Sequence, residues 1–302
     1  MVSMRRDGKA LPIATILLAL LAIWYVAAVF LNAPFAYDTA ERGGTPLPTL
    51  TELVPITMSQ ERPVLPAPHQ VAAEIWKTTG EMALNGRAFS KRSLIYHAWI
   101  TLSATLLGFA IGTALGIALA VGIVHSRAMD KSVMPWVITS QTIPILAIAP
   151  MIIVVLNAMG ISGLLPKALI STYLSFFPVV VGMVAGLRAP ERADLDLMHT
   201  YSASPAQTLW KLRLPASLPY LFTALKIAVS ISLVGAIVGE MPTGAVAGLG
   251  ARLLAGSYYG QTVQIWAALL TAAALAGTLV WIVGLMHSLV LTRMGLSQGR
   301  AT

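Results

Sequence analysis

Six long apolar runs dominate this 302-residue sequence and restrict what it can fold into. Each run is close to the roughly 20 residues that a helix needs to cross a bilayer. Charged residues make up only 11% of the chain, against about 25% in soluble domains. Since backbone polar groups in lipid have to be satisfied within a segment, helices are favoured. We predict an all-α polytopic membrane protein with about six transmembrane helices, at Leu11–Leu31, Ala98–Val124, Trp136–Ala158, Leu164–Leu187, Leu218–Glu240 and Ile265–Leu291.

The first run admits two interpretations. It follows Arg5, Arg6 and Lys9, as a secretory signal peptide would. Its apolar stretch is longer than the 7–15 residues usual for the core of a signal. We therefore expect a retained transmembrane helix.

The distribution of basic residues predicts the orientation. With six spans, both termini lie on one side, and short cytoplasmic segments carry an excess of Lys and Arg. The segments expected inside hold most of the basic residues near span ends, whereas the short outer connections hold only Lys167 and Arg252. We expect a cytoplasmic tail and the first span at 1–31, and an extracytoplasmic loop at 32–96 that contains an amphipathic helix from Gln70 to Leu94. A core of five spans is expected at 97–291, including a cytoplasmic coupling loop at 188–217, followed by a cytoplasmic tail at 292–302.

Several classes of function find no support in the sequence. The chain has no cysteine and no G-x-x-x-x-G-K-[ST] motif, so neither thiolate chemistry nor an ATP-binding phosphate loop is expected. Neither H-x-x-x-H nor H-E-x-x-H occurs, and the five histidines are dispersed, so no metal site is predicted. The predicted spans contain no pair of carboxylates, so intramembrane proteolysis is not indicated. We expect neither a catalytic residue nor a cofactor bound by this chain.

The cytoplasmic loop at 188–217 has a readable local structure. Ser204, Pro205 and Gln207 form a capping-box pattern with proline at the first helical position. A short helix is predicted from Ser204 through Lys211, ended at Leu214-Pro215, because the residue before proline is disfavoured in helical geometry. A preceding helix is expected at 189–201. This helix–turn–helix is either a simple connector or a docking element for a soluble partner.

The loop at 188–217 and several flanking stretches resemble the integral-membrane permease subunits of bacterial ABC importers, closest to the nitrate/sulfonate/taurine branch. Such permeases share a cytoplasmic E-A-A…G…I/V-x-L-P signature. Asp196-Leu197-Met198 falls at the E-A-A place, Ser202 at the glycine place, and Leu212-Arg213-Leu214-Pro215 at the end. Serine for glycine is a departure, as is the loss of both alanines. Supporting stretches are LPAP (65–68), HAWITLSATLLGFAIGTALG (97–116), QTIPILAIAP (141–150), FFPVVVGMVAGL (176–187) and GEMPTGAVAGLG (239–250).

The resemblance implies a type I importer fold in the bacterial inner membrane. It implies a second permease copy or related permease, an extracytoplasmic solute-binding protein, and cytoplasmic ATPase subunits that hold ATP and Mg²⁺. The residues carried over to ATPase coupling are Asp196, Ser202, Ser204, Pro205, Gln207, Leu212, Leu214 and Pro215. The solute would be a nitrate-, sulfonate- or taurine-like anion or a heterocyclic vitamin precursor such as a pyrimidine.

Two rivals stay open at this stage. An ion-gradient-driven transporter would place ionisable groups near the middle of several spans, and a non-transporting scaffold would use the loop at 188–217 only as an adaptor.

Polar residues inside the predicted spans are candidates for a translocation path. Gln141 and Thr142 precede Pro144 in the third predicted span, where the two prolines Pro144 and Pro150 are expected to kink the helix. Glu240 is either a residue at the outer mouth of the path or an interfacial carboxylate paired with Arg252. In the second span, small residues at intervals of four predict close helix packing, at Ala104, Gly108, Gly112, Gly116 and Ala120.

Overall fold

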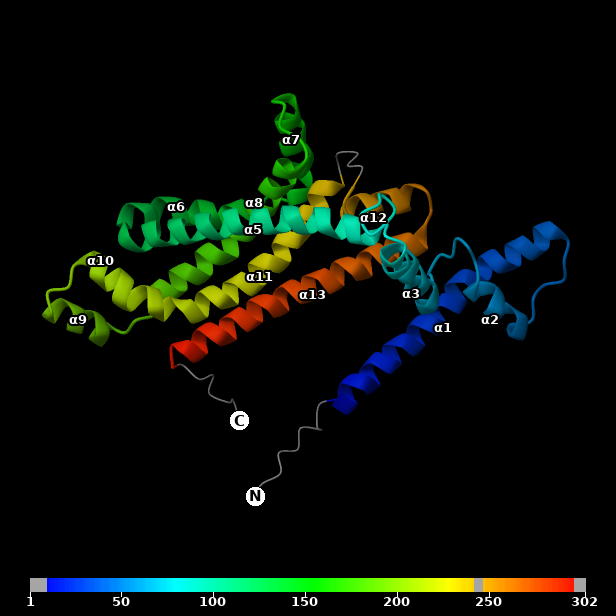
Figure 1. Ribbon diagram of the computed structural model, residues 1–302, viewed down its shortest axis with the longest axis horizontal. Helices are drawn as coiled ribbons and strands as arrows, with labels where there is room; N and C mark the ends of the chain where they lie inside the picture. The colour runs from blue at the N-terminus through cyan, green and yellow to red at the C-terminus, as the bar shows by residue number, and fades with distance from the viewer. Residues whose placement is uncertain (1–9, 242–246, 296–302) are drawn as a thin grey trace, which may run out of the picture. The chain divides into compact units, whose positions relative to one another are not determined.

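The computed structural model describes residues 10–241 and 247–295, which are almost entirely helical (Figure 1). The chain divides into two compact units. Unit 1 contains the residues up to Ile95 together with Arg252–Thr271, and unit 2 contains Tyr96–Ala251 with the residues from Ala272 onward. Two long helices, α5 (Leu94–His125) and α13 (Thr262–Arg293), each contribute residues to both units.

Unit 1 is built on α1 (Ala10–Gly43), a helix of 34 residues. The segment predicted as an extracytoplasmic loop is largely helical. It contains α2 (Leu50–Met58), α3 (Pro68–Trp76), the π-helical turn η1 (Lys77–Glu81) and α4 (Met82–Leu84). The amphipathic helix expected after Gln70 is therefore present, but it ends at Leu84, before Asn85-Gly86.

Asn32 fixes the loop between α2 and α3 onto α1. Its fully buried side chain accepts N–H donors from Val64 at 2.7 Å and Leu65 at 3.1 Å and donates to the Leu65 carbonyl at 2.8 Å. Trp24 adds a second contact, since its indole N–H donates to the Pro66 carbonyl at 3.0 Å. Asn32, at the end of the first apolar run, thus provides hydrogen-bond partners for backbone groups of this loop that would otherwise be unpaired.

Unit 2 holds the other apolar helices and the predicted cytoplasmic loop. After α5 come α6 (Arg127–Ser140), α7 (Ile145–Ala158) and α8 (Leu164–Leu187), followed by α9 (Arg192–Thr200) and α10 (Pro205–Thr208). A π-helical turn, η2 (Leu209–Arg213), leads into α11 (Leu214–Glu240). The short helix α12 (Leu249–Tyr258) begins in unit 2 and continues into unit 1.

Among the described residues, five helical segments are long and apolar enough to cross a membrane, at Leu11–Gly43, Leu94–His125, Leu164–Leu187, Pro205–Glu240 and Thr262–Arg293. They correspond to five of the six predicted spans. The expectation of a single kinked third span is wrong, because α6 and α7 are separate helices that bend by 98° at the break between Ser140 and Ile145. Pro144 caps the start of α7 instead of kinking a continuous helix. Counting this broken pair as one span gives the predicted six.

The small-residue stripe of α5 packs against α8, as the sequence predicted. A Cβ added at Gly112 would meet Ser175 and the Thr172 carbonyl, and one at Gly116 would meet Val179. Gly235 of α11 approaches the backbone of Ser171 on α8 in the same way. Helix α8 therefore lies between α5 and α11 at distances that only small side chains allow, and these three helices form the core of unit 2 (Figure 1).

Candidate functional site

The turn between α9 and α10 has the hydrogen bonds of a Schellman motif. The Ser202 N–H donates to the His199 carbonyl at 2.9 Å, and the Ala203 N–H donates to the Met198 carbonyl at 3.0 Å. Ser202 has φ +51°, a left-handed conformation that non-glycine residues adopt at a cost. The residue at the glycine place of the resembled signature therefore keeps the backbone conformation that favours glycine.

The predicted capping box at the start of α10 is confirmed. The Gln207 N–H donates to the Ser204 hydroxyl oxygen at 3.3 Å, and the Ser204 N–H donates to Gln207 Oε1 at 2.8 Å. Pro205 occupies the first helical position, where its missing N–H is not needed. Two consecutive motifs, the Schellman turn and the capping box, thus fix the direction in which the chain reverses.

The predicted end of this helix at Leu214-Pro215 is wrong. One helical segment runs from Pro205 to Glu240, through η2 and into α11. The π-turn places one extra residue before Pro215, so the helix accommodates a proline that cannot donate an N–H in the ordinary pattern. Leu212 and Leu214 are half-buried in this stretch, and Leu214 packs against the core cluster of unit 2.

Apolar side chains are exposed around the turn. Leu197, Tyr201 and Trp210 are 55%, 77% and 70% exposed, and Asp196 beside them is also exposed. A 360 Å³ cavity lies next to the turn and is lined by residues of α5, α9, α10 and η2, among them His125, Leu195, His199 and Arg213. Exposed apolar groups rimmed by polar ones are typical of an interaction surface.

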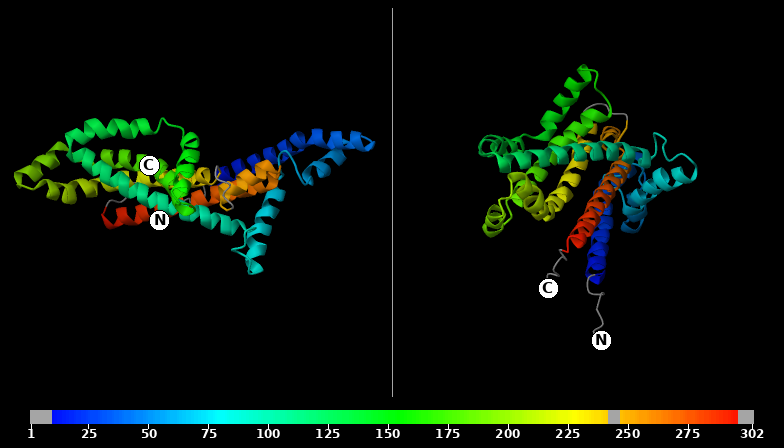
Figure 2. Two further views of the ribbon diagram at one scale, coloured as in Figure 1. Left: turned by 90° about the horizontal axis from the view of Figure 1, so that it is seen from above. Right: turned by 60° about the vertical axis from the view of Figure 1, so that its left-hand side comes forward.

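The base of the turn is attached to the core at two points. The guanidinium of Arg213 donates to the carbonyl of Leu187, the last residue of α8, at 2.7 Å. The next residue, Arg188, forms an ion pair with Asp130 of α6 at 2.9 Å. The turn thus belongs to the same end of unit 2 as the α5–α6 junction (Figure 2).

The residues predicted for a translocation path do not come together. Gln141 lines a 720 Å³ cavity on α8 and α11, whose other lining residues include Phe177, Pro178, Tyr220 and Ile227. Thr142 is exposed and donates to the Thr139 carbonyl at 2.8 Å. Glu240 is absent from this lining. The role of these residues in transport stays a prediction.

Glu240 is fully buried, and its partner is not the expected one. Its carboxylate lies 3.7 Å from the ammonium of Lys167, near the start of α8, while the Arg252 guanidinium donates to the Arg92 carbonyl at 3.3 Å. The predicted pairing with Arg252 is therefore wrong. Lys167 had been counted as a charge of a short connection, yet it lies three residues inside the apolar run Leu164–Leu187. That position was the only signal that pointed to it.

The buried carboxylate belongs to a polar cluster that caps α12. The Gly250 N–H donates to Glu240 Oε2 at 2.9 Å, the Leu249 N–H donates to the Thr101 hydroxyl at 2.9 Å, and the Gly248 N–H donates to His97 Nδ1 at 3.0 Å. These are the N–H groups that a helix start leaves without intrahelical partners. Lys167 also donates to the Ala247 carbonyl, at 3.2 Å. Sequence reasoning missed Thr101 and His97 because they lie about 140 residues away from Glu240 along the chain.

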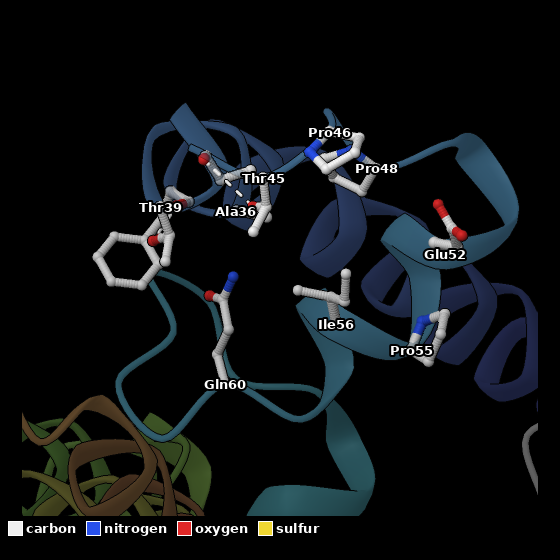
Figure 3. A pocket seen from close by; sticks show the side chains of 11 residues that line it. Ala36, Thr39, Thr45, Pro46, Pro48, Glu52, Pro55, Ile56 and Gln60 are labelled. Carbon is white, nitrogen blue, oxygen red and sulfur yellow. Dashed lines mark hydrogen bonds between the residues drawn. The ribbon is translucent and has the colours of Figure 1, made fainter. Parts of the chain in front are cut away.

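A further cavity, of 650 Å³, lies in unit 1 between α1 and α2 (Figure 3). Apolar and proline side chains make up most of its wall, including Phe35, Pro46, Pro55 and Ile56. Glu52 lies at its rim, where hydrogen bonds from the Thr49 N–H and hydroxyl lower the pKa of the carboxyl. This carboxylate completes the capping box at the start of α2.

The family is decided by comparison with known proteins. Residues 112–295 match the model of the family described as "Binding-protein-dependent transport system inner membrane component". The chain belongs to this family. The match includes the α9–α10 turn, the cavity of α8 and α11, and Lys167, Glu240 and the start of α12, whereas His97 and Thr101 of the same cluster precede it.

Curated relatives extend the likeness beyond that region. The chain is 31% identical over 227 residues to the riboflavin transport system permease protein RibX of Chloroflexus aurantiacus, covering 75% of this chain and 79% of the relative. It is 28% identical to the formylaminopyrimidine transport permease protein ThiX of Halalkalibacterium halodurans, covering 82% and 81%. A probable ABC transporter permease protein of Haemophilus influenzae is 33% identical, with 64% of this chain and 78% of the relative covered.

A solved structure supports the fold. A chain of the MetNI methionine ABC transporter, in an inward-facing conformation, matches with a TM-score of 0.50 at 18% identity, covering 76% of this chain and 97% of that chain. The protein is thus a multi-pass, all-α permease subunit of a binding-protein-dependent importer, a transport component and not itself an enzyme.

Proposed function

We propose that this permease couples ATP hydrolysis on partner subunits to the import of a heterocyclic vitamin precursor or related flat, weakly charged solute. The observation that carries the coupling part is the α9–α10 turn, which is rigidly capped on both sides yet exposes Leu197, Tyr201 and Trp210. A turn that must transmit force needs fixed geometry and a surface to bind. Asp196, Ser202, Ser204, Pro205, Gln207, Leu212, Leu214 and Pro215 form or support that turn.

In this proposal, two ATPase subunits bind ATP and Mg²⁺ and grip the turn from the cytoplasm. Their closure moves the turn, and the motion passes into α11 through the continuous helix that starts at Pro205. Both termini of the permease face the same compartment. A second permease copy or related chain completes the path, and an extracytoplasmic binding protein delivers the solute.

The chemistry of the α8–α11 cavity favours the heterocyclic class of solute. Its described lining contains Phe177, Tyr220 and several aliphatic side chains, with Gln141 and Thr223 as polar groups and no Lys or Arg. An aromatic ring can stack on such a wall and hydrogen-bond to the amide. A nitrate or sulfonate ion would be expected to meet cationic donors. The named solutes of RibX and ThiX, riboflavin and formylaminopyrimidine, are of the heterocyclic class.

Cross-linking tests the coupling part of the proposal. Cysteine at Ala206, in the first turn of α10, should cross-link to the ATPase subunit in membranes, while cysteine at Leu84 in unit 1 should not. Labelling of Ala206→Cys by an impermeant reagent from outside the cell would contradict the proposed orientation.

Uptake assays test the solute. ATP-dependent uptake in proteoliposomes that contain the full complex should be supported by the binding protein loaded with a pyrimidine or flavin, and should be sensitive to vanadate. Tyr220→Ala should reduce that uptake without reducing the amount of assembled complex. Uptake of nitrate or an alkanesulfonate instead would favour the anion class, which the sulfonate and nitrate permeases among the relatives represent.

A further inference from the structure

The helical segment that leaves the coupling turn ends at the buried charge pair. It runs without a break from Pro205 to Glu240, a length of 36 residues. At 1.5 Å per residue this is about 54 Å. Ser204 caps one end of the segment, and Glu240 at the other end lies against Lys167, Thr101 and the first turn of α12.

We propose that Glu240 and Lys167 are positioning residues that transmit the movement of this segment to α12. The inference rests on the proposed function, because the movement originates at the coupling turn. It adds where that movement is passed on. When the end of α11 moves, the start of α12 moves with it, because the Glu240 side chain of α11 is hydrogen-bonded to the Gly250 backbone of α12.

The geometry favours a fixed attachment over a sliding contact. Three successive backbone N–H groups, of Gly248, Leu249 and Gly250, are each paired with a side chain of the core. Gly248 has φ +127°, a conformation open to glycine, and a Cβ there would overlap the Glu240 carboxylate. The chain therefore passes against the carboxylate as closely as it can, and little movement is possible without breaking several hydrogen bonds together.

The charges matter because the cluster is sealed from water. The side chain of Glu240 is 0% exposed and that of Lys167 is 12% exposed. Removing one member of a buried ion pair leaves the other charge uncompensated, whereas removing both can be nearly neutral. This asymmetry distinguishes a charge pair that positions α12 from a residue that merely fills space.

The test is a double-mutant cycle in the assembled complex. Glu240→Gln keeps the size of the side chain and an oxygen that can accept the Gly250 N–H, and Lys167→Met keeps most of the length of lysine. Each single variant is expected to retain ATP hydrolysis within about twofold. Solute uptake is expected to fall by about tenfold, a factor within the usual range for coupling between two sites. The double variant Glu240→Gln/Lys167→Met is expected to recover uptake relative to Lys167→Met.

Hydrogen exchange gives a second readout that does not depend on transport. In the full chain in nanodiscs, the peptide that contains residues 247–252 should exchange faster in Lys167→Met than in the unchanged protein. If a single charge variant does not assemble, Thr101→Val serves instead, since it keeps both charges and removes the hydroxyl that accepts from the Leu249 N–H and donates to the Glu240 carboxylate. Asp130→Asn is the control for the exchange measurement alone: it breaks an exposed ion pair elsewhere in unit 2 and should leave exchange at 247–252 unchanged.

Either of two results would overturn the proposal. One is normal uptake together with unchanged exchange at 247–252 in both single variants. The other is a double variant no better than Lys167→Met, which would show that packing and not charge is at stake. Absence of ATP-dependent uptake in the unchanged complex would instead contradict the proposed function, and the exchange measurement would still test the attachment of α12.

Discussion

The two ends of unit 2 hold ion pairs of opposite character. At the turn end, Arg188 and Asp130 are 2.9 Å apart, with side chains 48% and 39% exposed. At the other end, Lys167 and Glu240 are 3.7 Å apart but almost completely buried. The shorter pair is expected to contribute less, because water and salt screen exposed charges. Burial, and not distance, decides how much each pair matters.

This contrast has a functional counterpart. The turn end is fixed by backbone hydrogen bonds and local caps, and its apolar side chains Leu197, Tyr201 and Trp210 are exposed, as the proposed docking to an ATPase requires. The buried end satisfies its polar groups internally through residues from three helices. The turn end is therefore accessible to another molecule, whereas the buried end makes its polar contacts within the chain.

The largest effect is expected from Lys167→Met. The buried carboxylate of Glu240 would lose its counter-charge, and breaking a buried pair typically costs about 3–5 kcal/mol. Thermal unfolding of the purified permease in detergent should show a large decrease in stability. A decrease no greater than that of Asp130→Asn would contradict the claim that the buried pair stabilises the protein more than the exposed one.

A smaller effect is expected from removing the cap at the turn. Replacing both Ser204 and Gln207 by alanine removes both hydrogen bonds of the capping box and should destabilise the start of α10 by about 1 kcal/mol. Stimulation of the partner ATPase by the permease should fall, while membrane insertion, measured by the amount of protein in the membrane fraction, should not. Unchanged stimulation would argue against this turn as the docking element.

Ser202→Gly should act in the opposite direction. Glycine removes the strain of a left-handed residue, about 1–2 kcal/mol, but adds entropy to the unfolded chain, so a net gain of about 0.5 kcal/mol is expected. Thermal unfolding measures it, and Ser202→Ala, which keeps the Cβ, is the matched control. Equal stability of the glycine and alanine variants would show that the conformation at position 202 is not strained.

The smallest effect is expected from Asp130→Asn. An exposed pair is worth about 0.2–1 kcal/mol, and because both of these side chains are well exposed the loss should lie at the lower end of that range and shrink further in 1 M salt. Unfolding measured at low and high salt checks this. A loss comparable to that of Lys167→Met would contradict the expected difference between an exposed and a buried ion pair.

Much of the fold could be predicted because its signals are local. The lengths of the apolar runs predicted five of the spans. The small-residue stripe of α5 predicted its close packing against another helix, which is α8, and Ser204 with Gln207 predicted the start of α10. Each depends on residues within one or two turns of helix. The prediction failed where a local rule had an alternative solution, as at Pro215, which a π-turn accommodates, and at the break between Ser140 and Ile145, where a helix ends instead of kinking.

The sequence by itself determined that this protein is a bundle of membrane helices with a capped turn between α9 and α10, because hydrophobic length and helix caps depend on neighbouring residues. Only the tertiary structure decided which charge compensates Glu240. Lys167, Thr101 and His97 come from other helices, and an ion pair is specified by distance in space and by exclusion of water. Neither quantity can be read from positions along the chain, which is why Arg252, nearer in sequence, was the wrong choice.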